Sequence, residues 1–152
     1  MERKKILIVD DNNEICELIK EYLEMLDGFE VKTETNSSLA LATIHAFKPD
    51  MIFLDIVMPE TEGSEISRKL LLENDTKDIP VIFLTGIVTD HDIDKRDGYL
   101  EGRPCLAKPI TLKKLLACIQ RHLRYPTDAS SYRSDEPYSL NRMKMQKSAE
   151  FG

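Results

Sequence analysis

Short apolar runs alternate with longer amphipathic segments over the first 125 residues of the chain. The runs at residues 6–9, 51–54, 79–84 and 105–107 contain almost no polar positions, which is typical of strands buried on both faces of a parallel sheet. Residues 29–35 alternate apolar and polar side chains, as an edge strand does. The pattern therefore predicts five strands.

Each strand is followed by a segment in which apolar residues recur at three- and four-residue spacing, the period of a helix with one buried face. Gly28 is expected to end the first helix, Ser37 or Ser38 to cap the second, and Thr111 to cap the last. A fourth, weaker helix is capped by Thr89 or Asp90. The predicted helices cover residues 15–26, 39–47, 66–71, 90–97 and 112–123.

Strict alternation of strands and helices favours an α/β fold, with a doubly wound, mostly parallel five-stranded sheet flanked by five helices. From Pro126 onward the pattern changes to Ser, Tyr, Pro and balanced charge. We therefore expect one domain over residues 1–125 and a C-terminal tail over residues 126–152. The tail is predicted to be flexible, or to form a short helix around residues 140–151.

The composition narrows the classes of protein that this fold can serve. The chain has 152 residues, 41% hydrophobic and 32% charged, and a net charge of -6, which argues against a surface that binds nucleic acid. The sequence has neither a signal-peptide core nor an apolar run of membrane-spanning length, so a cytoplasmic protein without membrane contact is expected. Cys16, Cys105 and Cys118 lack metal-binding spacing and are predicted to be reduced thiols.

Polar residues with complementary chemistry follow four of the predicted strands. They are Asp10 and Asp11, Asp55, Thr85, and Lys108. Because the carboxyl ends of parallel strands share one edge of a sheet, these side chains are expected to converge. Three carboxylates need a compensating cation, and Mg²⁺ suits a site with few carboxylates and several waters.

Such a site favours phosphoryl transfer to a carboxylate. Asp55 would be both metal ligand and nucleophile, forming an aspartyl phosphate. Lys108 and the Thr85 hydroxyl would each contact one phosphoryl oxygen, while Gly86 leaves room for the phosphate.

Each residue also has a simpler explanation. Asp10 or Asp11 can cap the first helix, and Asp55 can cap the loop that follows its strand. Thr85 can be an ordinary strand residue, and Lys108 can lie on a solvated turn. Their joint occurrence at successive strand ends favours a shared site over four separate coincidences.

Residues 4–124 resemble the receiver domain of bacterial two-component response regulators. The motifs that carry the resemblance are Asp10-Asp11, Asp55 with Met58-Pro59 and Gly63, Thr85-Gly86, and Lys108-Pro109. The resemblance implies a flavodoxin-like sheet in the order 2-1-3-4-5 and a cis Lys108-Pro109 bond. It also implies Mg²⁺ bound by Asp11, Asp55 and the Val57 backbone carbonyl, with Asp10 acting largely through water.

One part of the chain departs from that family. An aromatic residue commonly stands three positions before the family's lysine, and here Cys105 occupies the position after Pro104. A thiol cannot fill the volume of a ring, so the coupling of Thr85 to the output surface is expected to differ. Tyr99 is the candidate substitute for the missing ring, and residues 98–103 also lack the family's glycine-alanine pattern.

The resulting hypothesis is a single-domain response regulator in a phosphorelay, phosphorylated on Asp55 by a sensor histidine kinase or phosphotransfer protein. It would signal to a downstream protein, without direct DNA binding, and would not be an enzyme beyond its own phosphorylation and dephosphorylation. A homodimer through residues 90–123 or through the tail is possible. Two alternatives stay open, namely a receiver-like scaffold that is never phosphorylated and a Mg²⁺-dependent phosphohydrolase with an Asp nucleophile.

Overall fold

The structure is a computed structural model that describes residues 2–123. The chain divides into two units, one ending at Pro109 and the other starting at Ile110, and each is described by itself. The tail predicted for residues 126–152, with its short helix, lies outside the described residues.

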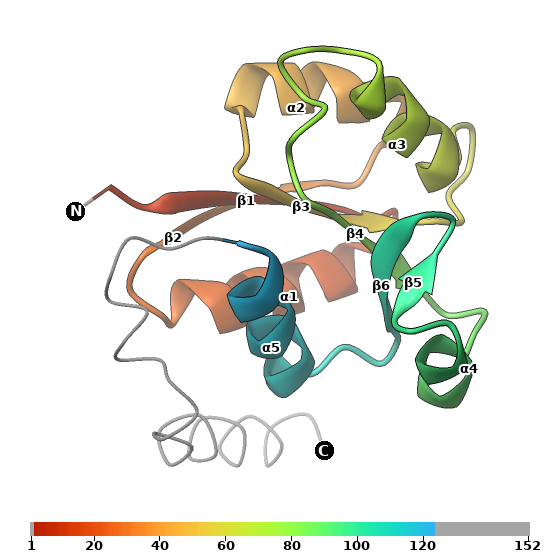
Figure 1. Cartoon of the computed structure of the whole chain (residues 1–152). Coiled ribbons are helices and arrows are strands. Elements are labelled where there is room, and N and C mark those ends of the chain that lie inside the picture. Colours follow the sequence, from red (N-terminus) through yellow and green to blue (C-terminus); the bar gives the residue numbers. More distant parts are fainter. Residues whose placement is uncertain (1, 124–152) are drawn as a thin grey trace. The chain divides into compact units, whose positions relative to one another are not determined.

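The first unit is built on one sheet of six strands, shown in Figure 1. The strands are β1 (Lys4–Val9), β2 (Phe29–Glu34), β3 (Met51–Asp55), β4 (Val81–Thr85), β5 (Tyr99–Leu100) and β6 (Arg103–Ala107). Their spatial order is β2-β1-β3-β4-β6-β5, and all neighbours are parallel except β5 and β6. All five predicted strands are present in the predicted parallel order. The predicted total of five is wrong, because β5 adds a sixth strand.

The additional strand comes from a tight hairpin. Glu101 and Gly102 connect β5 to β6 with φ angles of 50° and 80°, the left-handed geometry that suits a two-residue turn between twisted strands. Leu100 pairs with Arg103 across this turn. The hairpin therefore turns the segment before Cys105 back along the sheet edge, where the sequence analysis predicted no strand.

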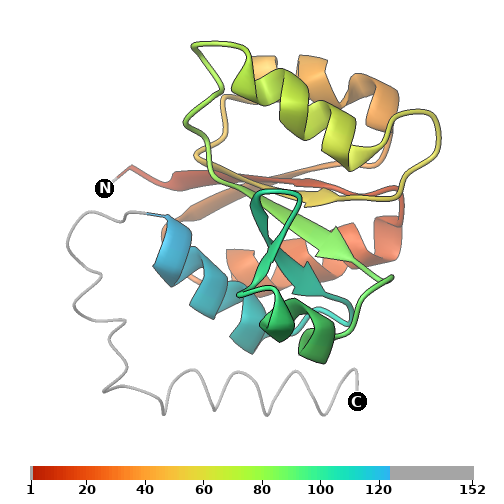
Figure 2. The ribbon, with the colours of Figure 1, turned by 45° about the vertical axis from the view of Figure 1, so that its right-hand side comes forward.

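The predicted helices are all present. They are α1 (Asn13–Glu24), α2 (Ala40–Phe47), preceded by the 3₁₀ turn η1 (Ser37–Leu39), α3 (Gly63–Leu71), α4 (Asp90–Lys95) and, in the second unit, α5 (Leu112–His122). In Figures 1 and 2, α2 and α3 cover one face of the sheet and α1 lies on the other. This is the layered α/β arrangement expected from the sequence.

The helix caps follow the predictions in two places and differ in two others. The Thr89 and Thr111 hydroxyls accept hydrogen bonds from the third residue of α4 and of α5, as predicted. Neither Ser37 nor Ser38 caps the second helix, since its N-cap residue is Leu39, which makes no side-chain capping bond. Asn36 accepts the Ser38 N–H and so caps the preceding turn η1. The first helix ends at Glu24, so its predicted extension to residue 26 is wrong.

Alternate residues of the parallel strands face α2 and α3 and form a buried core. The side chains of this core come from four strands, three helices and the loop after β3: Leu7, Val9, Ala40, Ile44, Ile52, Leu54, Met58, Ile66, Leu70, Val81, Phe83, Ile93, Cys105 and Ala107. Close packing on this side holds the strand ends in fixed positions. Among the helices that the structure describes, none has both the length and the apolar content needed to cross a membrane.

Candidate functional site

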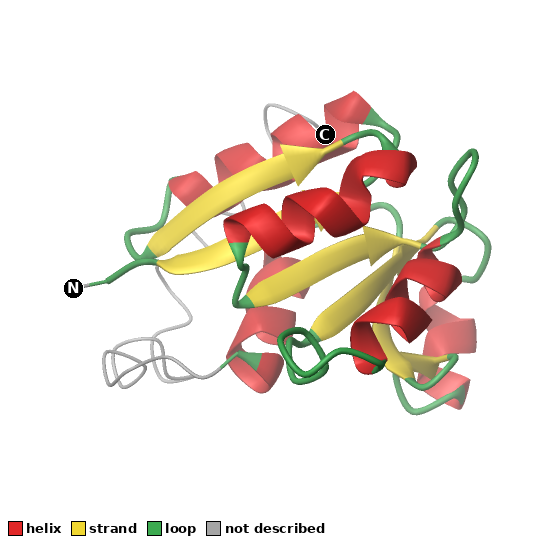
Figure 3. Ribbon diagram, turned by 90° about the horizontal axis from the view of Figure 1, so that it is seen from above, coloured by secondary structure: helices red, strands yellow, loops and turns green. Residues whose placement is uncertain are grey.

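The predicted residues lie at the carboxyl edge of the sheet, toward which the arrowheads of the parallel strands point in Figure 3. Asp55 and Thr85 are the last residues of β3 and β4, while Asp10 and Lys108 directly follow β1 and β6. The strand registers align Asp55 with Leu84 and Thr85 with Ala107. The parallel topology therefore brings together residues that are almost 100 positions apart in the sequence.

Lys108 contacts two of the carboxylates. Its Nζ atom lies 2.9 Å from Asp10 Oδ2 and 3.6 Å from Asp55 Oδ2. Burial by itself would lower the pKa of Lys108, but the contacts with Asp10 and Asp55 outweigh burial and raise it. The ammonium is therefore a permanent positive charge beside both carboxylates.

One ammonium does not balance this acidic cluster. The pKa of Asp55 is raised to about 7, first because the carboxyl is buried and second because Asp10 lies beside it. Lys108 opposes this rise without cancelling it. A further cation at the site would favour the ionised form that a nucleophilic carboxylate needs.

The carboxylates of Asp10, Asp11 and Asp55 are arranged to hold such a cation. One oxygen from each lies within 4.8 Å of the others. Asp10 is fully buried, and within residues 2–123 its Oδ2 atom has no hydrogen-bond partner beyond the ion-pair contact with Lys108. The buried Asp10 oxygen thus keeps a free lone pair, and the Asp11 and Asp55 carboxylates lie next to it. Such a set of oxygen ligands fits a hard cation such as Mg²⁺.

Asp10 has a fixed place in the loop after β1. Its Oδ1 atom accepts the Asn12 N–H at 2.9 Å, and its backbone carbonyl accepts a hydrogen bond from Cys16 Sγ at 3.3 Å. Asn12, in turn, caps α1 by accepting the N–H groups of Glu14 and Ile15. Capping is thus the role of Asn12, so the simpler explanation for Asp10 and Asp11 does not hold.

Cys16, on α1, is held beside this loop as a thiol. Burial and the neighbouring Asp10 carboxylate raise its pKa to about 12. All three cysteines are free, in agreement with the prediction of reduced thiols. Cys16 therefore supports the Asp10 loop as a neutral donor.

Thr85 and Gly86 line the site from β4. Thr85 is 2% exposed, and its Oγ1 atom accepts the Ile87 N–H at 3.1 Å, which leaves the hydroxyl proton available for another acceptor. A side chain at Gly86 would approach no atom more closely than Lys108 Cδ, at 4.0 Å. The space in front of β4 is therefore open on the side of Lys108.

Val57 stands two residues after Asp55 and contacts its carboxylate through the backbone N–H. Its N–H donates to Asp55 Oδ1 at 3.3 Å, and its side chain is 56% exposed. The proposed metal ligand at this residue is the backbone carbonyl, and its assignment stays a prediction. The Val57 side chain adds an apolar group, with no acid or base, at the mouth of the site.

Gly63 is required by close packing that the sequence could not show. A Cβ atom at this residue would overlap the Asp55 carbonyl oxygen, and the Gly63 N–H donates to Ile56 O at 2.8 Å. The start of α3 is thereby packed directly onto the backbone of the central acidic residue. Only the glycine itself, as part of a motif, was a signal in the sequence.

Cys105 lies on β6, the strand predicted for residues 105–107. It is 5% exposed and belongs to the core facing α2 and α3. Tyr99 is 47% exposed and pairs with Pro104 on the edge hairpin. Tyr99 therefore does not fill the ring position that Cys105 leaves vacant in this conformation.

Comparison with known proteins identifies a family for this chain. Residues 6–120 match the family described as "Response regulator receiver domain". The chain is 39% identical over 120 residues to the nisin biosynthesis regulatory protein NisR of Lactococcus lactis subsp. lactis, covering 79% of this chain and 50% of NisR. It is 30% identical to the polar-differentiation response regulator DivK of Brucella anthropi, covering 79% of this chain and 96% of DivK.

A solved structure shares the fold. The chemotaxis response regulator CheY4 of Vibrio cholerae superposes with a TM-score of 0.68 and 30% identity, covering 80% of this chain and 99% of CheY4. The chain spans about half the length of relatives such as NisR and nearly the full length of DivK and CheY4. The shared region is the domain that carries the acidic site.

Proposed function

Because the chain belongs to the response regulator receiver domain family, we propose that Asp55 accepts a phosphoryl group from the phosphohistidine of a sensor histidine kinase or a phosphotransfer protein. The observation that carries this proposal is the Lys108 ammonium, held 2.9 Å from Asp10 and 3.6 Å from Asp55 at the end of the sheet. A phosphoryl group on Asp55 would need a fixed positive charge beside its oxygens, and the Lys108 ammonium lies at that point.

The proposed reaction uses the groups at the strand ends. An Asp55 carboxylate oxygen attacks phosphorus, an O–P bond forms, and the P–N bond of the donor breaks with its electron pair returning to the imidazole nitrogen. Lys108 and the Thr85 hydroxyl each donate to a phosphoryl oxygen. Charge on those oxygens is stabilised by positioned donors, so little rearrangement of the chain is needed at the moment of transfer.

The carboxylates fit a role for Mg²⁺. Asp11, Asp55 and the Val57 carbonyl would hold the ion, with Asp10 acting through water, and the ion would supply positive charge to the carboxylates and to the phosphoryl oxygens. Asp10 and Asp11 would be positioned toward the ion by the loop that the Asn12 and Cys16 hydrogen bonds hold in place.

The phosphorylated domain is proposed to act through protein partners. Phosphorylation would shift an existing equilibrium between two conformations of the domain, and a downstream protein would bind one of them.

The direct test is labelling with radioactive acetyl phosphate in the presence of Mg²⁺. We expect incorporation of an acyl phosphate that is labile to acid and alkali, and a loss of at least about 100-fold in the Asp55→Asn variant. Asp50→Asn, at the opposite edge of the sheet, is the matched control and should label normally. Undiminished labelling of Asp55→Asn would defeat the assignment, and no labelling of the natural chain would favour the scaffold alternative.

A phosphohydrolase is disfavoured by the residue beside the nucleophile. Val57 cannot deprotonate a water, so the acyl phosphate should persist rather than turn over. Replacing Val57 by glutamate is expected to shorten the lifetime of the phosphoryl group by about tenfold, measured as the decay of label after removal of the donor. Val57→Leu, which adds no base, should change the lifetime little. An equal loss in both variants would show that a base is not what the site lacks.

A further inference from the structure

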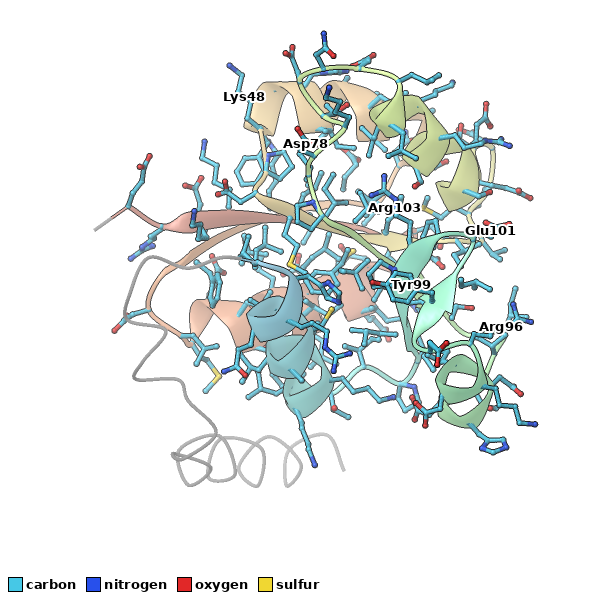
Figure 4. The ribbon with its side chains drawn as sticks, in the orientation of Figure 1. Lys48, Asp78, Arg96, Tyr99, Glu101 and Arg103 are labelled. Carbon is cyan, nitrogen blue, oxygen red and sulfur yellow. The ribbon has the colours of Figure 1, made fainter. Side chains whose placement is uncertain are left out.

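The side chain of Arg103 crosses from the β5–β6 hairpin to helix α3. Its Nε atom donates to Ser67 Oγ at 2.9 Å, and Ser67 is 4% exposed. Figure 4 shows Arg103 between the hairpin and α3, with Glu101 at the hairpin tip. This single side chain is a polar link between two elements of the first unit, which we call the Arg103–Ser67 clasp.

The clasp is not a fully satisfied interaction. The Nη2 atom of Arg103 is buried without a hydrogen-bond partner, and within residues 2–123 no carboxylate forms an ion pair with this guanidinium. Burial also lowers the pKa of Arg103. A long arginine can extend its charged end into solvent, where these costs vanish, so a second position of comparable free energy is available to it.

Both elements joined by the clasp reach the acidic site, β6 with its last residue and α3 with its first. Strand β6 runs from Arg103 into Lys108, whose ammonium contacts Asp10 and Asp55. Helix α3 starts at Gly63, which is packed against the Asp55 backbone without room for a side chain. A shift of Lys108 would therefore move β6 relative to α3, because the start of α3 is held against the Asp55 backbone.

The face of β6 that points toward α3 has no other long side chain. Cys105 and Ala107 are on that face with Arg103, and both are buried in the core. Because the thiol at residue 105 is small, Arg103 is the long side chain on this face of β6 that contacts α3. The hairpin that carries Arg103 is the extra strand pair at the edge of the sheet.

We propose that the Arg103–Ser67 clasp is the switch contact of this receiver, closed in the unphosphorylated domain and opened when a phosphoryl group on Asp55 draws Lys108 and β6 toward it. Opening would release the guanidinium to the surface of the hairpin, where it would present a positive charge to a partner. This inference rests on the proposed function, because it takes Asp55 as the phosphoacceptor.

The test uses the whole chain with Mg²⁺ and beryllofluoride, a mimic of the phosphoryl group. Hydrogen exchange of the Arg103 Nε–H is measured by ¹⁵N NMR, with the signal assigned from its loss in Arg103→Lys. We expect slow exchange in the free domain and exchange at least about tenfold faster with the mimic bound. Protection that stays unchanged in the bound state would overturn the clasp as a switch contact.

A matched pair of variants separates a switch from a merely structural bond. Ser67→Ala removes the acceptor that favours the closed state, so the affinity for beryllofluoride is expected to rise by about fivefold. Ser64→Ala, on the same helix but outside the clasp, should leave that affinity unchanged. An unchanged affinity in Ser67→Ala would overturn the proposal. Failure of the natural chain to bind beryllofluoride would instead overturn the proposed function, and the clasp mechanism with it.

Discussion

Replacing Asp55 by asparagine is expected to stabilise the metal-free protein at pH 8 by about 2 kcal/mol. The pKa of Asp55 in the folded chain rises from its ordinary value of 3.8 to about 7, because of burial and the neighbouring Asp10. Ionising this group above pH 7 therefore costs folding free energy, roughly 4 kcal/mol before solvent screening reduces it. Asparagine avoids that cost and can still accept the Val57 N–H.

The pH dependence has a definite sign. Unfolded Asp55 ionises near pH 4, whereas the folded form keeps its proton up to about pH 7. The folded state binds more protons in this window, so its stability falls as the pH rises from 4 to 7 and is level above that. The advantage of Asp55→Asn should therefore be small at pH 4 and reach its full size at pH 8, measured by urea unfolding in EDTA.

Magnesium should reverse the order of the two proteins. The natural chain is expected to gain stability as Mg²⁺ is added, by about 2.7 kcal/mol at a free concentration 100 times the dissociation constant, while Asp55→Asn gains much less. Asp50→Asn is the control, since Asp50 accepts the Lys5 N–H far from the site. It should show neither the gain at pH 8 nor a lost response to Mg²⁺. A less stable Asp55→Asn in EDTA at pH 8 would contradict the repulsion inferred among the carboxylates.

The strand ends were predictable because two simple rules apply to them. Apolar runs identify buried parallel strands, and parallel topology places their carboxyl ends on one edge, so Asp10, Asp55 and Lys108 had to converge once the strand order was right. The cis Lys108-Pro109 bond, implied by the family resemblance, is also present. These features depend on local pattern and on topology rather than on details of packing.

Features that depend on competing local choices could not be predicted in the same way. Asp10, Asp11, Asn12 and Asn13 are all good capping residues, and only the backbone geometry selects Asn12. The β5–β6 hairpin has a two-residue turn with a single glycine, which is a weak signal amid charged residues. Its two-residue strand has no period that a sequence pattern can reveal.

Features that depend on contacts between distant residues were also beyond the sequence. The Arg103–Ser67 hydrogen bond joins residues 36 positions apart, and neither residue type is unusual where it stands. The raised pKa of Asp55 results from burial together with the approach of Asp10, and both require the folded arrangement. Such properties depend on how α3, β1, β3 and β6 are arranged in the folded chain.

Gly63 is expected to be the most sensitive position to a single added methyl group. In Gly63→Ala the new Cβ would overlap the Asp55 carbonyl oxygen, which belongs to a central strand that cannot move aside. The start of α3 must then shift from its hydrogen bond with Ile56 O. We expect the free energy of unfolding to fall by about 3 kcal/mol or more, measured by urea unfolding, because overpacking against backbone has no side chain to relax.

Gly86→Ala makes the same chemical change at the other glycine of the site and should act differently. Its Cβ would meet only Lys108 Cδ, at 4.0 Å, so the free energy of unfolding should change by less than about 1 kcal/mol. The methyl group would nevertheless occupy space beside Lys108 in which the phosphoryl group is proposed to lie, so labelling by acetyl phosphate should slow. A Gly86→Ala variant that labels at the natural rate would place the phosphoryl group elsewhere.

A Gly63→Ala variant of natural stability would show that α3 is free to move relative to Asp55. The Arg103–Ser67 clasp requires a fixed helix, so this result would also contradict the clasp.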